Sequence, residues 1–300
     1  MSNPAMKPRI SVVQYLNTVP LVWGMIRGQQ QGLFDLEFTV PAKCADAVAS
    51  GRADVGIIPA IEYQRIAGLE IIDSLSISSK AEVRSVLLLT RKPIQKIRTV
   101  AMDESSRTSV ALLTIILNKF YGLSITSIPA QADAEAMLAR ADGALIIGDP
   151  ALAFRDSAVR VYDLAAEWRK FTGWPFVFAV WAGKAEARLG RWARDFQASL
   201  RYGLAHLDDI AREYAPRHGM TPGEVKSYLT ENINYTLDKE NVEGLRLFFR
   251  LACDLELIPE AREVRFASPA GSRPQRPERH AKRNGDAHHQ SSSARNVALG

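Results

Sequence analysis

The sequence predicts an α/β fold of two lobes with a ligand-binding cleft between them. Strand and helix patterns alternate through residues 9–90 and again through residues 98–162. One further apolar strand is expected at residues 174–181, and every later apolar pattern is helical. Alternation at this spacing is typical of βαβ units that build a mainly parallel sheet. Two such units joined by crossing strands predict two lobes.

The first alternating unit begins with the strand pattern Ile-Ser-Val-Val near the start of the chain. Its strands are expected at residues 9–14, 36–40, 53–59 and 85–90. A helix is expected to run from the Asn17-Thr18 loop through Met25, and a second over residues 43–50, closed by Gly51. No element is assigned between residues 60 and 84.

The second alternating unit repeats this pattern. Its strands are expected at residues 98–102, 125–128, 143–148 and 159–162. Helices are expected at residues 108–121, where apolar side chains recur at helical spacing, and at residues 133–141. The strand at residues 174–181 is extended from the residue before Pro175 onward.

The C-terminal part is expected to be helical, over residues 185–215 and in two shorter helices starting near Thr221 and Asp238. The apolar faces of these helices must pack against a lobe, so the chain is expected to return to the first lobe through residues 176–181. The predicted division is 1–92 plus 182–267 for the first lobe, 93–181 for the second, and 268–300 for a disordered basic tail. This is the architecture of periplasmic-type binding proteins, with a ligand in the cleft.

Composition narrows the function classes. The net charge is +5, but residues 268–300 hold six basic and two acidic residues, so the body is nearly neutral and gives no general reason to expect nucleic-acid binding. No apolar run approaches the roughly 18–20 residues of a membrane helix. The start lacks the apolar region of a signal peptide. With Cys44 and Cys253 expected as reduced thiols, the sequence predicts a cytoplasmic protein outside the membrane.

The richest candidate site is the stretch Asp-Glu-Ser-Ser-Arg-Thr-Ser at residues 103–109. Its pattern predicts the end of a strand, a turn and the first turn of a helix. The candidate hydrogen-bond donors are Ser105, Ser106, Thr108 and Ser109. Unpaired N–H groups and the positive end of a helix dipole suit a carboxylate or phosphate. The structural alternative is that a serine only caps the helix.

Other polar residues are expected at the carboxyl ends of strands or beside a crossing strand, where α/β sheets bind ligands. They are Asn17, Thr18, Arg84, Ser85 and Asp149. Each has a structural alternative, because Asn17 and Thr18 suit a turn, Arg84 a solvated charge, and Asp149 a helix cap. Taken together, hydroxyl and amide donors without metal ligands favour binding of an anionic organic molecule.

Several chemistries lack their usual motifs. The body contains only His206 and His218, both in the C-terminal helical part, so no histidine is expected near the polar loops. The sequence has no GxGxxG, Walker, GxSxG or HExxH motif. We therefore expect no metal and no cofactor. The sequence indicates no oligomeric state.

The polar loops and strands also carry a resemblance. Tyr-Leu-Asn-Thr-Val-Pro-Leu at 15–21, Asp-Val-Gly-Ile-Ile-Pro at 54–59, Arg-Ser-Val at 84–86, Asp-Glu-Ser-Ser-Arg-Thr-Ser at 103–109 and Thr-Gly-Trp-Pro-Phe-Val-Phe-Ala-Val-Trp at 172–181 occur in one order. Over residues 9–266 the chain resembles the chorismate dehydratase family of the futalosine route to menaquinone. The resemblance implies a type-2 periplasmic-binding-protein-like fold. It also implies conversion of chorismate, a small-molecule substrate, to 3-(1-carboxyvinyloxy)benzoate and water.

On this resemblance, the hydroxyl groups of residues 105, 106, 108 and 109, with Arg107, are expected to hold one carboxylate. Asn17, Thr18 and Ser85 would orient the other end or the hydroxyl of the substrate, with Arg84 beside them. Asp149 would orient the substrate or accept a proton, although the substrate's own carboxylate is an equally open choice of base. The alternatives are the dihydroxynaphthoate-forming sister enzyme of the same pathway and a non-catalytic aromatic-acid binding protein.

Overall fold

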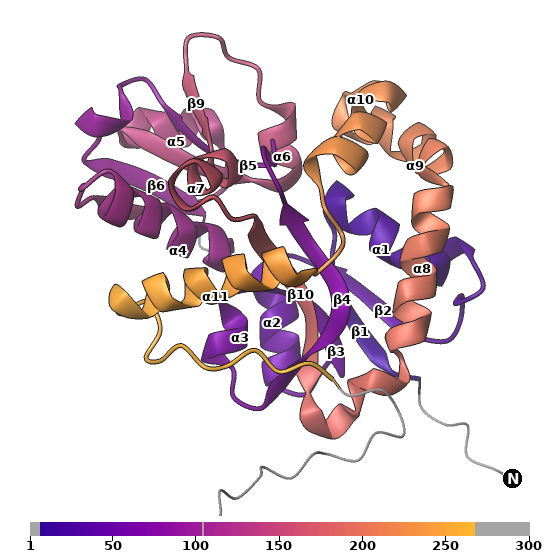
Figure 1. Ribbon diagram of the computed structural model, residues 1–300. Helices are drawn as coiled ribbons and strands as arrows, with labels where there is room; N and C mark the ends of the chain where they lie inside the picture. Colours follow the sequence, from indigo (N-terminus) through magenta and orange to yellow (C-terminus); the bar gives the residue numbers. More distant parts are fainter. Residues whose placement is uncertain (1–6, 104, 268–300) are drawn as a thin grey trace, which may run out of the picture. The chain divides into compact units, whose positions relative to one another are not determined.

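The computed structural model describes residues 7–103 and 105–267, and it contains two five-stranded sheets. We call the sheet β2-β1-β3-β10-β4 with its helices the first lobe, and the sheet β7-β6-β8-β5-β9 with its helices the second lobe (Figure 1). The predicted two-lobed α/β fold is therefore confirmed. The predicted tail at 268–300 lies outside the described residues.

In the first sheet, β1 pairs in parallel with β2 and β3, whereas β10 runs antiparallel between β3 and β4. The strands are β1 (Arg9–Val13), β2 (Asp35–Thr39), β3 (Val55–Pro59), β4 (Leu69–Ser79) and β10 (Phe176–Lys184). β3 is buried along its whole length, as a central strand covered on both faces should be.

The second sheet repeats this plan, because β6 pairs in parallel with β7 and β8 while β5 runs antiparallel between β8 and β9. Its strands are β5 (Val86–Thr90), β6 (Thr99–Asp103), β7 (Thr126–Ala130), β8 (Gly143–Ile147) and β9 (Arg160–Asp163). The carboxyl end of β6 leads toward Ser105, and that of β8 leads directly into the helix that begins at Gly148, as the alternation predicts.

Two boundaries differ from the sequence prediction. The first lobe was expected to extend to residue 92, but β5 belongs to the second sheet, so the chain crosses between β4 and β5. The second lobe was expected to extend to residue 181, but β10 belongs to the first sheet, so the chain returns before Phe176. β4, in the unassigned region, is the outermost strand of the first sheet.

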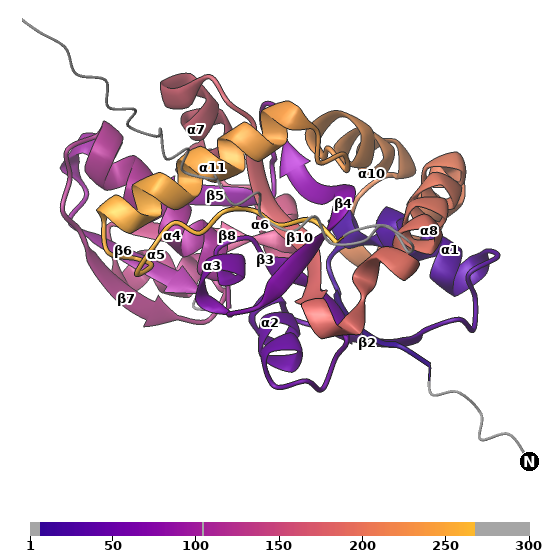
Figure 2. The same ribbon diagram turned by 60° about the horizontal axis from the view of Figure 1, so that its bottom comes forward.

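The helices cover these sheets at the bounds α1 (Val19–Arg27), α2 (Pro41–Ala49), α3 (Glu62–Arg65), α4 (Arg107–Ile115), α5 (Ala134–Arg140), α6 (Gly148–Ala153), α7 (Leu164–Thr172), α8 (Ala193–Ala205), α9 (Leu207–Tyr214), α10 (Pro222–Ser227) and α11 (Lys239–Asp254). The C-terminal helix α8 packs beside α1 of the first lobe (Figure 2). α11 also touches α4 of the second lobe. No helix of the described part of the chain is long and apolar enough to cross a membrane.

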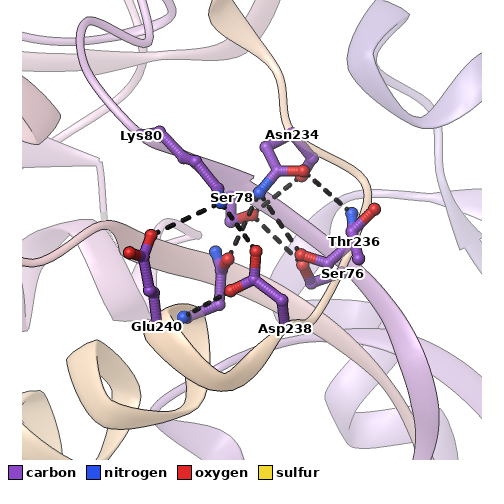
Figure 3. A network of polar contacts seen from close by, with 8 residues as sticks. Ser76, Ser78, Lys80, Asn234, Thr236, Asp238 and Glu240 are labelled. Atoms are coloured by element: carbon purple, nitrogen blue, oxygen red, sulfur yellow. Dashed lines mark hydrogen bonds and ion pairs between the residues drawn. The ribbon is translucent and has the colours of Figure 1, made fainter.

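A polar network holds the segment between α10 and α11 on β4 (Figure 3). The backbone N–H groups of Ser78 and Asn234 each donate to the other's carbonyl, at 3.0 and 2.8 Å. The Lys80 ammonium lies 2.6 Å from the carboxylate of Asp238, the residue that caps α11. These contacts fix the C-terminal segment next to the crossing at residues 80–85.

Candidate active site

A cleft of about 540 Å³, counting the space open to solvent, lies where the two lobes meet. The first lobe lines it from the ends of β1 and β3, from β4 and β10, and from the loop after β1. The second lobe lines it from the start of α4 and the end of β8. The polar lining residues are Tyr15, Asn17, Ser85, Ser106, Arg107, Thr108 and Ser109. Apolar side chains such as Ile77 and Phe178 complete the wall, so the cleft suits a ring with polar substituents.

The start of α4, where the sequence predicts an anion-binding site, borders the cleft. Ser106 is the N-cap residue, and its side chain makes no capping hydrogen bond. The N–H groups of the first helical turn have no carbonyl partner within the helix. Ser106 and Ser109 are each 4% exposed and line the cleft. Among the described residues, the helix therefore presents backbone donors without a partner and two hydroxyl groups at the cleft.

Ser105 and Thr108 are placed differently. The Ser105 hydroxyl donates to the Asp103 carboxylate at 2.8 Å, and Ser105 is not among the cleft-lining residues. The Thr108 hydroxyl accepts a hydrogen bond from the backbone N–H of Ile61 at 3.2 Å, which links the two lobes. Because Thr108 accepts there, and no acceptor for its own proton is found among the described residues, this hydroxyl can donate to a ligand in the cleft.

Arg107 lines the cleft, but first-lobe carboxylates occupy its guanidinium. One nitrogen lies 3.0 Å from Glu62 of α3 and the other 3.0 Å from Asp46 of α2. Glu62 is almost fully buried, and it also pairs with Arg65 at 2.9 Å. Arg107 therefore joins the start of α4 to the first lobe in addition to bordering the cleft.

The loop after β1 contributes Asn17 from a 3-10 turn at Leu16–Thr18. Thr18 is 1% exposed, and its hydroxyl donates to the Asn17 side-chain oxygen at 3.3 Å. Thr18 is not among the cleft-lining residues. Its contact leaves the Asn17 amide N–H groups as donors, and the Asn17 side chain also contacts the buried phenol of Tyr228.

At the crossing between the lobes, Ser85 lines the cleft and is fully buried. Its neighbour Arg84 has a left-handed backbone, with φ of 60°. This conformation is held by Asp163, which accepts the backbone N–H groups of Val83 and Arg84 at 3.0 and 2.6 Å. The Arg84 side chain lines a separate groove of the second lobe instead of the cleft.

Asp149 follows β8 but lies behind the cleft wall instead of lining it. One carboxylate oxygen accepts the backbone N–H of Leu16 at 3.1 Å. The other lies 3.7 Å from Nδ1 of His218. Burial raises the pKa of the Asp149 carboxyl, and the Leu16 hydrogen bond and His218 oppose this. The expectation that no histidine lies near the polar loops is therefore wrong, because the C-terminal segment folds back onto α6.

The structure thus brings together six of the predicted residues, namely Asn17, Ser85, Ser106, Arg107, Thr108 and Ser109. It places Thr18, Ser105 and Asp149 against neighbours of these residues, and the Arg84 side chain elsewhere.

Three residues at the site were not predicted. Tyr15 lines the cleft, and burial with the nearby charges of Asp103 and Asp149 raises the pKa of its phenol to about 12. A Cβ on Gly148, whose φ is +64°, would meet the Tyr15 ring at 2.9 Å, so glycine is required there. Tyr228 donates to Ser85 at 2.8 Å, and His218 faces Asp149. Apart from the position of Tyr15 beside Asn17, no local pattern marks these residues.

The described residues contain no group of three or more histidine, cysteine or acidic side chains placed to hold a metal ion. The chemistry offered by the cleft is hydrogen-bond donation from hydroxyl, amide and helix N–H groups. Such donors stabilise negative charge on a bound carboxylate or on a reacting carbon framework conjugated to one.

Comparisons with known proteins show the family of the chain. Residues 8–254 match the model of a family described as menaquinone biosynthesis. The chain is 29% identical over 234 residues to the chorismate dehydratase of Thermus thermophilus, covering 72% of this chain and 85% of that protein. It is 25% identical over 251 residues to the chorismate dehydratase of Campylobacter jejuni, covering 82% and 97%.

Solved structures confirm the fold. A protein from Archaeoglobus fulgidus matches with a TM-score of 0.68 and 16% identity, covering 85% of this chain and 100% of that chain. The periplasmic aliphatic sulphonate binding protein of Escherichia coli matches with a TM-score of 0.63 and 15% identity, covering 93% and 98%. The expected periplasmic-binding-protein-like fold is therefore confirmed.

Proposed function

Because the chain belongs to the menaquinone biosynthesis family, we propose that it is a chorismate dehydratase, which converts chorismate to 3-(1-carboxyvinyloxy)benzoate and water. The observation that carries this proposal is the cleft in which the start of α4 and the side chains of Asn17 and Ser85 meet. The enzyme would work without a cofactor. It would act in the cytoplasm, where Cys44 and Cys253, both free thiols, stay reduced.

The donors of the cleft match the charge of the substrate. Chorismate carries two carboxylates, and a helix N-terminus with flanking hydroxyl groups is suited to bind one of them. Ser106, Thr108 and Ser109 supply those hydroxyl groups. Arg107 supports this end mainly by holding α4 in place, since its guanidinium is already paired. Asn17 and Ser85 would orient the other end of the substrate.

The same donors suit the reaction. Removal of the C3 proton leaves negative charge that the ring diene delocalises into the ring carboxylate. Donors fixed around that carboxylate stabilise the charge as it develops. The C4 hydroxyl then leaves with the electron pair of its bond to carbon, and with the proton taken from C3 it makes up one water. Formation of the aromatic ring drives this step.

The base in this proposal is the enolpyruvyl carboxylate of the substrate itself. The cleft holds that carboxylate near C3, so proton transfer becomes intramolecular. Asp149 is not among the cleft-lining residues, and its oxygens bind the Leu16 N–H and face His218. Its role would be to hold the loop that carries Asn17.

The test is to incubate the purified full chain with chorismate and to separate the products by liquid chromatography with mass detection. The expected product has the mass of chorismate less one water, and it forms in proportion to the protein added. The variant S106A/S109A is the control, because it should stay folded and form product far more slowly. Binding of chorismate without turnover would contradict the proposal and favour a non-catalytic binding protein. Formation of dihydroxynaphthoate from its own precursor, with chorismate untouched, would favour the sister enzyme.

A further inference from the structure

A buried tyrosine from the C-terminal part of the chain contacts a serine of the cleft. Tyr228 begins the π-helical turn Tyr228–Asn232 that continues α10, and it is fully buried. Its phenol oxygen lies 2.8 Å from Oγ of Ser85. π-helical turns are frequent at functional sites, and this one delivers its first side chain to the crossing between the lobes.

The direction of this hydrogen bond follows from the two groups. Burial raises the pKa of the Tyr228 phenol well above its ordinary value, so the phenol keeps its proton at every working pH. A phenol is also a stronger acid than an aliphatic hydroxyl, and it is therefore the better donor of the pair. Tyr228 donates and Oγ of Ser85 accepts.

Because Oγ of Ser85 accepts from Tyr228, the remaining question is where the Ser85 hydroxyl donates its own proton. The Ser85 carbonyl accepts the Gly148 N–H at 2.7 Å, so the backbone that carries the hydroxyl is fixed. Within the described residues, Oγ of Ser85 has no acceptor for its own proton, and Ser85 lines the cleft. This proton is therefore available to a ligand in the cleft.

We propose that Tyr228 is a positioning residue that orients the Ser85 hydroxyl as a hydrogen-bond donor to a substrate oxygen in the cleft. This inference rests on the proposed dehydratase function. Ser85 donates a hydrogen bond to the C4 oxygen and stabilises the charge that develops on it as its bond to carbon breaks. Neither Tyr228 nor Ser85 loses its proton in this step.

Contacts around Tyr228 hold its hydroxyl next to that of Ser85. The segment that follows the π-helical turn is fastened to β4 by Ser78, Asn234, Lys80 and Asp238 (Figure 3). β4 leads directly into the crossing that carries Ser85. Donor and acceptor therefore belong to two segments that are held to each other.

The chain offers a matched control. Tyr235 lies seven residues further along the same segment and is also buried, but its hydroxyl has no hydrogen-bond partner among the described residues. Tyr228→Phe and Tyr235→Phe each remove one buried phenol oxygen and keep the ring. Only the first removes a donor to a residue that lines the cleft.

The experiment measures kcat and KM for chorismate, together with thermal unfolding, for the wild type and for Y228F, Y235F, S85A and S85A/Y228F. We expect S85A to lower kcat by about 100-fold. Y228F should lower kcat by about tenfold, as the loss of one orienting hydrogen bond implies, with KM and melting temperature little changed. Y235F should resemble the wild type. The double variant should match S85A, because Tyr228 acts through Ser85, whereas independent effects would multiply to about 1,000-fold.

Two results would overturn the inference while leaving the proposed function intact. One is a wild-type chain that converts chorismate with Y228F as active as Y235F. The other is a double variant whose loss is the product of the two single losses. A folded wild-type chain that does not convert chorismate would instead overturn the proposed function, and this inference with it.

Discussion

The guanidinium of Arg107 lies 3.0 Å from the buried carboxylate of Glu62, so the helix whose first turn borders the cleft is joined to the opposite lobe. The same guanidinium pairs with Asp46, and the neighbouring Thr108 hydroxyl accepts the Ile61 N–H. Three links between the lobes therefore meet at the start of α4. The helix terminus that would hold a substrate carboxylate is also the point where the cleft is closed.

Glu62→Gln tests this link. The variant leaves Arg65 and Arg107 without their shared buried counter-charge, which should cost about 2 kcal/mol and lower the melting temperature by about 4–8 °C. KM for chorismate should rise, because the start of α4 is held less firmly. Asp46→Asn is the control: this partner is half exposed, and the loss of its pair should change either quantity little. Equal effects of the two variants would contradict the role given to Glu62.

Ser109→Ala tests whether the first turn of α4 binds a carboxylate of the substrate. The Ser109 side chain lines the cleft from the first turn of α4. Loss of one hydrogen bond to a carboxylate should raise KM by about tenfold. The melting temperature should change little, because the variant removes only a hydroxyl at the cleft wall.

Ser105→Ala is the matched control for that prediction, since the Ser105 hydroxyl binds Asp103 and not the cleft. It should lower the melting temperature and leave KM unchanged. The reverse pattern in the two serine variants would mean that the first turn of α4 serves only to cap the helix.

Asp149→Asn separates two assignments of the base. The asparagine keeps an oxygen for the Leu16 N–H but cannot accept a proton as a carboxylate can. If the substrate carboxylate removes the C3 proton, kcat should fall by less than about tenfold, since only positioning is altered. A loss near 10⁴-fold, with substrate binding and folding intact, would make Asp149 the general base.

The acid stability of the second lobe is predicted to depend on Asp142. Lys92 beside this carboxyl, with the Arg98 N–H, lowers its pKa to about 2. Because the folded pKa lies below the ordinary value of 3.8, ionised Asp142 stabilises the fold above about pH 4, and this contribution disappears as the pH falls toward 2. Asp142→Asn should therefore lower the melting temperature at neutral pH, and the difference should vanish near pH 2. A difference that does not change with pH would contradict this.

The alternating elements and the donors at residue 17 and at residues 106–109 could be predicted from the sequence because both depend on local pattern. Apolar periodicity identifies a strand or helix, and polar residues at strand ends identify an edge. β4 was not assigned, because both of its faces are buried near its end, and Ser76 and Ser78 on one of them look like the solvent-exposed positions between Leu75 and Ile77 on the other. In the network of Figure 3 the Ser76 hydroxyl donates to Ser78, and the Ser78 hydroxyl donates to the carbonyl of Asn234, 156 residues further along the chain.

Contacts between distant segments account for the other differences. β5 has the apolar pattern of a strand in either lobe, and only its pairing with β8 and β9 decides which. Tyr228 and His218 reach the cleft region through the path of the C-terminal helices, which composition does not reveal. For the same reason, the sequence could not separate Ser105, which binds Asp103, from Ser106 and Ser109, which line the cleft.

The most direct test of the account is a crystal structure of the full chain with 3-(1-carboxyvinyloxy)benzoate bound. We predict one carboxylate within hydrogen-bond distance of the first-turn N–H groups of α4 and of the hydroxyl groups of Ser106 and Ser109. Asn17 and Ser85 should contact the rest of the ligand. A ligand bound outside this cleft, or bound in it with no carboxylate at the start of α4, would contradict the account.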